Sequence, residues 1–408
     1  RILALRVHSQ ANVGAYAHTK GVTIQLVIGP WVQTGVYDIP VIDFHFQALL
    51  SNQAPTGAYR GAGRPEAIYN IERLVDQAAR EIGLDRIALR RRNFIRPEQM
   101  PYTNPMQQTY DSGRFEHVMD QALQLADWDG FGARAADSAR RGLWRGLGIA
   151  TFLEWTGGNA FEERVTVDVR ADGVIEVFAA VNAMGQGIAT SLAQLVVDVF
   201  DVPLEQIRVV LGDTDRGNGF GSAGSRSLFT GGSALHAGAG EALDKARKCA
   251  AEALEAAPED IRYHAGRFVI AGTDREIGLF ELAGRQPGGH LLVEHTHTVA
   301  GPTWPNGAHV SEVEVDPNTG AVRLVAYASV NDVGRVVNPP IVRGQLDGGA
   351  VQGVGQAFME RMVYDAHSGQ LLTGSLMDYT APRADDIHAL FRTEMDESTP
   401  CRNNALGV

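Results

Sequence analysis

Residues Val174–Phe200 have the sequence VIEVFAAVNAMGQGIATSLAQLVVDVF, in which a strand, a glycine turn and a helix follow one another. Val174–Val181 is mostly apolar and predicts a strand, which Met184-Gly185-Gln186-Gly187 ends. Apolar residues at helical spacing then predict a helix to about Phe200. The first-turn N–H groups of such a helix have no intrahelical acceptor, and its dipole favours negative charge beside them. The turn therefore predicts an anion site, although a tight strand-to-helix turn is the commoner reason for this pattern taken alone.

The segments on either side also mix strands and helices. Ala171-Asp172-Gly173 predicts a hairpin turn before the quoted stretch, and an Ala-rich helix is expected at about Ser233–Ala256. The remaining expected strands are 143–153, 163–170, 206–211, 310–315 and 322–330, and the remaining expected helices are 65–82, 115–126 and 341–360. The short apolar stretches 22–28 and 41–46 are expected to be strands or irregular connections. Short strands and turns are expected at 261–300. This intermixture predicts an α+β fold, with mixed sheets and packed helices.

A second glycine loop, Thr56–Glu66, reads TGAYRGAGRPE and leads into the helix expected to end before Gly83. Arg60 and Arg64 stand among its glycines. A guanidinium fork suits a carboxylate, a phosphate or a polarised oxygen, so the loop is a candidate ligand contact. The alternative is a surface loop that caps the helix.

A third glycine loop, Gly221–Ser233, reads GSAGSRSLFTGGS and also precedes a helix. It offers backbone N–H groups, hydroxyls and Arg226 to a ligand, or it is a solvated surface loop. It is not a P-loop, because the Gly-x-x-x-x-Gly-Lys-Ser/Thr pattern is absent from the chain. A dinucleotide-binding Gly-x-Gly-x-x-Gly between a strand and a helix is absent as well.

A fourth segment, Gln345–Gln356, reads QLDGGAVQGVGQ and predicts a helix face lined by glycine. Close helix packing and contact with a ligand are equally good reasons for such a face. Glycine makes up 46 of the 408 residues, which is above the usual ~7%. Several ordered glycine loops in one chain suggest a large, phosphate-bearing ligand held by backbone N–H groups.

Other polar residues have ordinary structural explanations. Asp213 and Asp215 lie in a Gly-Asp-Thr-Asp sequence that favours a turn over a metal site. His295 and His297 match no zinc spacing and read as strand or loop residues. Cys249 falls in the Ala-rich helix, where an inert thiol is expected.

Composition excludes several classes of protein. The formal net charge is −12, which argues against nucleic acid or an anionic membrane as the main partner. Two cysteines are too few for a disulfide scaffold or for an all-cysteine iron–sulfur cluster held by this chain alone. We find no apolar run of the ~18 residues that span a membrane, and no signal peptide. Cytoplasm is the default expectation, with export by a signal on a partner as the alternative.

The chain of 408 residues exceeds one ordinary domain of ~100–200 residues, so two or more domains are expected. Residues 128–142 are polar and small, and we place the boundary there, giving domains 1–135 and 136–408. The chain opens at Arg1 without Met and stops at Val408, and both ends look cut.

Together these segments resemble the molybdenum-cofactor-binding large subunit of the xanthine oxidase and aldehyde oxidase family, which includes carbon monoxide dehydrogenase large chains. The motifs that carry the resemblance are Gly57–Glu66, Met184–Gly187, Gly212–Asp215 with Gly221–Ser233, and Asn331–Gln356. They occur in the family's order and at family-like intervals over nearly the whole chain. Each motif is weak evidence by itself, whereas four in order are strong evidence. On this resemblance, 1–135 is the C-terminal part of one molybdopterin-binding domain and 136–408 is most of a second.

The resemblance implies a molybdopterin cofactor, in bacteria usually its cytosine dinucleotide, whose dithiolene holds the molybdenum, so the chain itself supplies no metal ligand. In the proteins it resembles, the pterin and pyrophosphate are held by backbone donors of two loops, here Gly185-Gln186-Gly187 and Ser225-Arg226-Ser227. Gln352 resembles the glutamine that contacts the end of the pterin. The loop that faces the molybdenum and the substrate contains Tyr59, Arg60, Gly61, Ala62 and Gly63, of which Arg60 is the candidate catalytic residue.

The family hydroxylates carbon with oxygen from water, and the electrons leave through [2Fe–2S] clusters to flavin. The implied partners are therefore a [2Fe–2S] subunit, an FAD-binding subunit and a small-molecule substrate, in a dimer of heterotrimers. The family's general base is a glutamate beyond a segment of the Asn-Ala-Leu-Gly-Val type, and its Gly-Gly-x-Phe-Gly loop precedes the region of Arg1. Because this sequence stops at Asn404–Val408, we expect the base to lie outside it and the fragment alone to be inactive.

The carbon-monoxide-specific loop of the family has a cysteine after its Tyr-Arg pair, where this chain has Gly61. We therefore expect an aldehyde or an N-heterocycle as the substrate. The alternatives are a carbon monoxide dehydrogenase large chain, a non-catalytic family member that acts as a scaffold or in cofactor binding, and a metal-free protein that binds phosphate or nucleotide.

Overall fold

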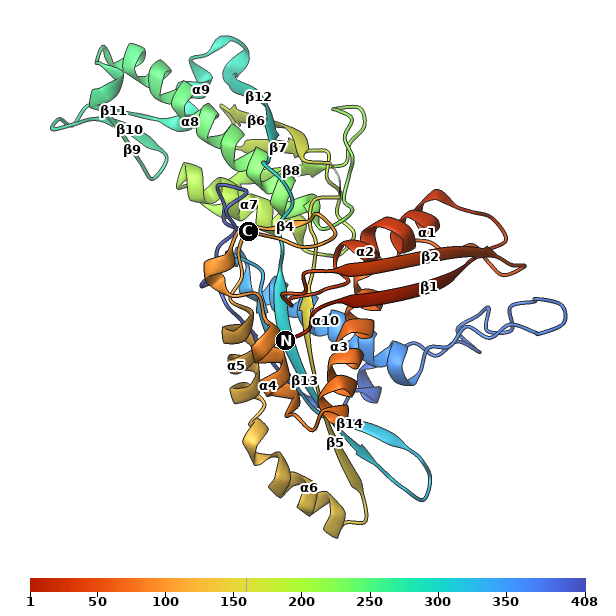
Figure 1. The fold of residues 1–408 in the computed structure, drawn as a ribbon. Helices are drawn as coiled ribbons and strands as arrows, with labels where there is room; N and C mark the ends of the chain where they lie inside the picture. Colours follow the sequence, from red (N-terminus) through yellow and green to blue (C-terminus); the bar gives the residue numbers. More distant parts are fainter. Residues whose placement is uncertain (159) are drawn as a thin grey trace. The chain divides into compact units, whose positions relative to one another are not determined.

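The computed structural model describes residues 1–158 and 160–408, which divide into two compact units, each described here by itself (Figure 1). Unit 1 consists of 1–154, 304–334 and 342–400, and unit 2 consists of 155–303, 335–341 and 401–408. Strands and helices are intermixed in both units, as an α+β fold requires.

The sheet of unit 2 has four strands in the order β12-β6-β7-β8. These are β12 His290–Thr298, β6 Glu162–Arg170, β7 Ile175–Ala179 and β8 Ile207–Leu211. β6 pairs antiparallel with both β12 and β7, whereas β7 and β8 run parallel. The hairpin turn predicted at Asp172-Gly173 is confirmed, and Gly173 provides the positive φ of 89°.

The core of unit 2 lies between this sheet and two helices, α7 Ile188–Phe200 and α8 Ser233–Leu254, both of which were predicted. Alternate residues of β6 are fully buried, and each contributes roughly 1.5–3 kcal/mol to stability. Alanines on one face of α8 allow the helix to approach β6 and β12 closely. A Cβ at Gly238 would come within 3.1 Å of both His295 and Val165, which is why the approach also needs a glycine.

Residues 261–289 form a small addition to unit 2. Strands β9 Ile261–His264, β10 Arg267–Ile270 and β11 Glu276–Gly278 make an antiparallel sheet. The expectation of short strands is confirmed here, but the chain also forms a helix that was not predicted, α9 Leu279–Gly284. Its Leu279 and Leu282 are fully buried, so the burial of apolar side chains stabilises a helix too short for sequence periodicity to reveal.

Unit 1 has a four-stranded sheet in the order β15-β14-β13-β5. The strands are β5 Trp144–Leu153, β13 Asn306–Val315, β14 Val322–Asp332 and β15 Leu390–Met395, with β15 parallel to β14 and the other pairs antiparallel. Helix α5 Phe115–Leu125 packs against β13 and β14, and α6 Phe131–Arg140 packs against β5. The small, polar stretch expected to separate domains thus forms α6 within unit 1.

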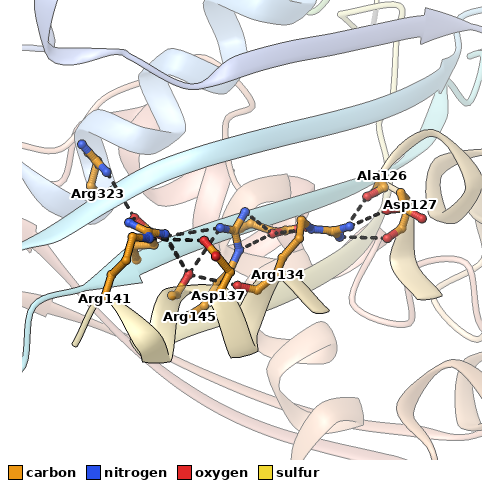
Figure 2. A network of polar contacts seen from close by, with 10 residues as sticks. Ala126, Asp127, Arg134, Asp137, Arg141, Arg145 and Arg323 are labelled. Carbon is orange, nitrogen blue, oxygen red and sulfur yellow. Dashed lines mark hydrogen bonds and ion pairs between the residues drawn. The ribbon is translucent and has the colours of Figure 1, made fainter. Parts of the chain in front are cut away.

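Two glutamates of β13, Glu312 and Glu314, are only 3% and 4% exposed and are surrounded by arginines. Arg134, Arg145 and Arg323 reach them from α6, β5 and β14, and Arg141 reaches Glu314 from the turn after α6. Figure 2 shows these four arginines within one network of hydrogen bonds and ion pairs, drawn as dashed lines. The network ties α6 to the sheet, because a buried carboxylate is stable only when it is paired.

Helices α3 Arg64–Glu81 and α4 Arg86–Asn93 complete the part of unit 1 that follows the first glycine loop. Glu72 of α3 is buried and accepts hydrogen bonds from Arg90 of α4 at 2.8 Å and from the Thr151 amide of β5 at 3.0 Å. Tyr37 also donates to Glu72. This buried cluster fixes α3, and so fixes the position of the loop that precedes it.

The N-terminal strands β1 Leu5–Gly14 and β2 Ile42–Leu50 form a parallel pair. Strands or irregular connections were expected at 41–46 and 22–28, and β2 confirms a strand for the first, whereas both alternatives are wrong for Val22–Ile28, which is helical. That segment continues α1 Thr19–Thr23 as a π-helical turn, Ile24–Ile28, which leads into α2 Gly29–Trp31. β-branched residues favour strands only weakly, and local packing overrides that preference.

Candidate functional site

The turn Met184–Gly187 in unit 2 opens α7 as the sequence predicts. Gly185 and Gly187 adopt positive φ angles of 91° and 77°, which favour glycine. Gly185 is exposed, and a Cβ built on it would meet nothing within 4 Å in the described chain. A ligand can therefore approach the backbone here, next to the first-turn N–H groups of α7 and the positive end of its dipole.

Asn182 and Ser222 join this turn to the third glycine loop, and sequence reasoning did not single out either residue. The Ser222 backbone N–H donates to Asn182 Oδ1 at 2.9 Å, and the Asn182 backbone N–H donates to Ser222 Oγ at 2.9 Å. Ser222 Oγ also donates to the Asn182 carbonyl at 2.8 Å and accepts from Ser227 Oγ at 2.7 Å. Two loops 40 residues apart are thus brought together in one polar assembly.

The side chain of Gln186 folds back on its own turn. Its Nε2 donates to the Asn182 carbonyl at 3.0 Å, and its Oε1 accepts from the Met184 amide at 2.7 Å. Gln186 therefore shapes the turn with its side chain and has its backbone left for a ligand.

Arg226 lies inside unit 2 rather than on its surface. Its guanidinium and the Glu163 carboxylate are 0% and 1% exposed and lie 2.7 Å apart. The guanidinium also donates to the carbonyls of Ala160, Gly221 and Glu162 at 2.8–3.0 Å. The buried Arg226 side chain thus holds the loop to the interior of unit 2. Ser225 is exposed and has a φ of 60°. Any ligand contact of this loop is left to its backbone and hydroxyls.

The backbone of this loop also lies against the backbone of Gly157 and Gly158. The Gly157 amide donates to the Gly224 carbonyl at 2.8 Å. A Cβ on Gly224 would lie 2.5 Å from the Gly158 Cα, so neither loop has room for a side chain at this crossing. The glycines here allow the two backbones to approach each other closely.

In unit 1, the Tyr59–Gly63 loop lies against α10 Pro339–Phe358. Arg60 Nη2 donates to the Gln345 carbonyl at 2.9 Å and to Gln345 Oε1 at 3.2 Å. Its guanidinium carbon lies 3.7 Å from a Cβ built on Gly349. Gln345, Gly349 and Gln352 are spaced i, i+4, i+7, which puts them on one helix face. Arg60 and Gln352, 292 positions apart in the sequence, are thus placed along the same face.

The loop itself is built on left-handed residues, with φ angles of 94° at Gly61, 38° at Ala62 and 91° at Gly63. Gly63 precedes α3 directly, and a Cβ on it would lie 2.8 Å from the Ile24 carbonyl. Arg64 turns inward to Glu154 at 2.6 Å. Of the two arginines in this loop, Arg60 is the exposed one.

Gln352 is held by a residue that the sequence analysis missed, Glu360. Gln352 Nε2 lies 3.0 and 2.9 Å from the two carboxylate oxygens of Glu360, and the Tyr379 hydroxyl donates to the same carboxylate at 2.9 Å. Partial burial and the negative charge of Glu360 raise the pKa of Tyr59. The carboxylate therefore lies close to the loop that contains Arg60.

Three glycines of α10 have open space beside them, whereas a Cβ on Gly349 would meet Arg60 and one on Gly355 would meet Pro382. A Cβ on Gly344, Gly348 or Gly353 would meet nothing within 4 Å in the part of the chain that the structure describes. Close helix packing within the described chain is therefore not the reason for these three glycines, and their backbone is open to a ligand.

The residues with ordinary explanations behave as expected. The Asp215 amide donates to Asp213 Oδ1 at 3.1 Å, which makes the predicted turn. His295 and His297 lie on β12, and Cys249 lies within α8, where burial raises the pKa of its thiol. Among residues 1–158 and 160–408, no group of three or more His, Cys, Asp or Glu side chains could hold a metal ion.

A membrane-crossing helix would have to be long and apolar, and none of the helices described in this structure meets that condition.

Each unit, taken by itself, offers groups suited to an anionic or polar ligand. Unit 2 offers an open glycine backbone at a helix N-terminus, and unit 1 offers an amide and a guanidinium along one face of α10. Such groups hold anions and polar rings rather than metal ions.

Comparison with known proteins identifies the class. Two family profiles, each described as a molybdopterin cofactor-binding domain, match residues 1–94 and 121–388. The chain therefore belongs to the molybdopterin-binding large subunits of the xanthine oxidase and carbon monoxide dehydrogenase family.

Two relatives are similar over most of this chain. The chain is 32% identical to the nicotine 6-hydroxylase large subunit of Paenarthrobacter nicotinovorans, over 94% of this chain and 50% of that protein. It is also 32% identical to the carbon monoxide dehydrogenase large chain of Hydrogenophaga pseudoflava, over 94% and 51%. The chain thus spans about half the length of these relatives.

The fold is shared with a solved structure, quinoline 2-oxidoreductase from Pseudomonas putida 86, with a TM-score of 0.89 and 31% identity. The match covers 100% of this chain and 54% of that one. The resemblance seen in the glycine motifs is therefore confirmed at the level of the family and the fold.

Proposed function

We propose that the protein to which this chain belongs is a molybdenum hydroxylase that oxidises an N-heterocycle or an aldehyde with oxygen from water. The observation that carries the proposal is the pair of open glycine backbones, at Gly185 and along α10, in a chain of this family. The similarity to nicotine 6-hydroxylase and quinoline 2-oxidoreductase, whose names describe N-heterocyclic substrates, supports the heterocycle in particular.

Each unit has a separate task in this proposal. In unit 2, the backbone N–H groups of Gly185–Gly187 and the Ser225–Ser227 loop bind the phosphates and the pterin, in its cytosine dinucleotide form. In unit 1, Gln352 binds the end of the pterin, while Arg60 orients the substrate. Molybdopterin, when bound, supplies the molybdenum that accepts the electrons of the oxidation.

Arg60 is suited to this task because Gln345 fixes the position of its guanidinium and other N–H donors of that group remain for a ligand. The two contacts with Gln345 both use Nη2, and a guanidinium has five N–H donors. The remaining donors can stabilise negative charge on a heteroatom of the substrate. The proposed reaction also requires a general base, for which a glutamate is suited. [2Fe–2S] and FAD-binding partner subunits receive the electrons, in a dimer of heterotrimers in the cytoplasm.

Carbon monoxide is a second candidate substrate, because the carbon monoxide dehydrogenase large chain of Hydrogenophaga pseudoflava is as similar to this chain, at 32% identity, as the nicotine 6-hydroxylase large subunit is. Gly61 in the Arg60 loop argues against it, since the carbon-monoxide-specific loop has a cysteine at that point. A non-catalytic role as a scaffold would be favoured if the full-length protein lacked the glutamate.

The test is a substrate screen on the full-length protein with its partner subunits. N-heterocycles, aldehydes and carbon monoxide are supplied with a dye as electron acceptor, in water enriched in oxygen-18. We expect oxygen-18 in the hydroxylated heterocycle or in the carboxylic acid. Turnover of carbon monoxide alone, or of none of the three classes, would contradict the proposal.

A further inference from the structure

The end of α10 is shaped so that Glu360 returns to the helix. The Met359 and Glu360 amides both donate to the Gly355 carbonyl at 2.8 Å, which ends the helix in a tight turn. The Glu360 side chain then passes over Gly355, where a Cβ would lie 3.0 Å from its Oε1 and 2.5 Å from Pro382. Gly355 therefore leaves the space through which Glu360 reaches Gln352.

The chemistry of this contact fixes which end of the Gln352 amide faces Glu360. A carboxylate only accepts hydrogen bonds, and both of its oxygens lie within 3.0 Å of Gln352 Nε2. The Tyr379 hydroxyl donates to the same carboxylate and so reinforces its role as an acceptor. The amide nitrogen is thus held by the protein, and Oε1 is the atom left to meet a ligand.

We propose that Glu360 is a positioning residue that holds the Gln352 amide in one orientation, so that Gln352 presents an acceptor oxygen to an N–H donor of the pterin. This role rests on the proposed function. Without Glu360 the amide can rotate by half a turn and present an N–H group to an N–H donor, which repels. With Gln352 Oε1 as the acceptor, the site favours a ring whose edge carries N–H groups, as the edge of a pterin does.

The test compares five proteins, each full-length and purified with its partner subunits. They are the unmodified protein, Glu360→Leu, Gln352→Glu, the exchange variant Gln352→Glu with Glu360→Gln, and Tyr379→Phe as the matched control. Tyr379→Phe removes a hydrogen bond from the same carboxylate without touching Gln352. The readouts are molybdenum and pterin per chain, and the Tm of each protein.

We expect Glu360→Leu to lower pterin and molybdenum content about fivefold, the value of one hydrogen bond. Gln352→Glu should lower it further, because two carboxylates then face each other. The exchange variant should regain at least half of the content, since the new glutamine donates to the new carboxylate, which still presents an acceptor oxygen. Tyr379→Phe should lower the Tm as Glu360→Leu does, but leave the cofactor content within about twofold, since the amide keeps its partner.

Equal loss of cofactor in Tyr379→Phe and Glu360→Leu would overturn the proposal, because packing at the end of α10 would then explain both. An exchange variant no better than Gln352→Glu would also overturn it, even if Glu360→Leu fails to fold. An unmodified protein that lacks molybdopterin is a different result, since it contradicts the proposed function itself.

Discussion

Arg226 stands in the loop that the sequence assigns to the cofactor, yet its side chain points into unit 2. The sequence reveals the residue type and the glycines around it, but not the buried Glu163 that pairs with the guanidinium. Such a pairing joins residues 63 positions apart and depends on how β6 meets the loop. Sequence motifs single out the loop, whereas burial shows that its backbone and hydroxyls, rather than the Arg226 side chain, are the groups a ligand could reach.

Arg226→Met should destabilise unit 2 by roughly 3–5 kcal/mol, because the Glu163 carboxylate would stay buried without its partner. The matched control is Arg164→Met, which breaks an exposed pair with Glu294 at 2.6 Å and should cost about 0–1 kcal/mol. Urea unfolding of both variants measures the difference. A similar loss of unfolding free energy in the two variants would show that the buried pair stabilises unit 2 no more than the exposed pair does.

Gly185 and Gly173 provide a second comparison at the residue scale. Both have a positive φ, 91° and 89°, and a Cβ on either would meet nothing within 4 Å. Each change to alanine should therefore cost about 1–2 kcal/mol in backbone strain. Gly185→Ala alone should lower the pterin content of the full-length protein, since only Gly185 lies at the N-terminus of α7. A pterin content lowered equally in both variants would remove Gly185 from the proposed site.

At the scale of elements, regular helices and strands were predictable, and departures from them were not. Helices α3, α5, α7 and α8 follow from apolar residues at helical spacing and from the glycines near their ends. The π-helical turn at Ile24–Ile28 and the short helix α9 were missed, since packing decides both. Likewise, the Asn182–Ser222 and Gln352–Glu360 contacts were missed, because no sequence spacing relates the partners.

The arginine network of Figure 2 makes a pH-dependent prediction for α6 and the unit 1 sheet. Hydrogen bonds from Arg141 and Ser138 lower the pKa of Glu314 to about 2. A lowered pKa in the folded state means that the ion pair stabilises the fold fully above the unfolded value of about 4.3. That stabilisation is lost as the pH falls from about 4.3 toward 2.

Thermal unfolding between pH 6 and 2 measures this effect. The Tm should fall with pH in the unmodified chain, and Glu314→Gln should have a lower Tm at pH 6 and a shallower fall below pH 4.5. Parallel curves for the two proteins would show that Glu314 does not link the network to pH.

At the scale of the whole molecule, the order of the glycine motifs indicated the family, and the fold and the family profiles confirm it. The boundary placed at 135 and 136 remains a prediction about the two cofactor-binding domains. The compact units are not continuous in sequence, since β13, β14 and β15 pair with the sheet of β5 after residues 155–303 have formed the main part of unit 2. Long-range strand pairing of this kind leaves no local signal in a sequence.

The central claim is that this chain holds molybdopterin through open glycine backbones. The most direct measurement is the content of molybdenum and pterin per chain in the full-length protein, purified from its native complex. We predict close to one of each. A folded protein with its partners present and neither molybdenum nor pterin bound would contradict the claim, and would leave a scaffold or a phosphate-binding protein in its place.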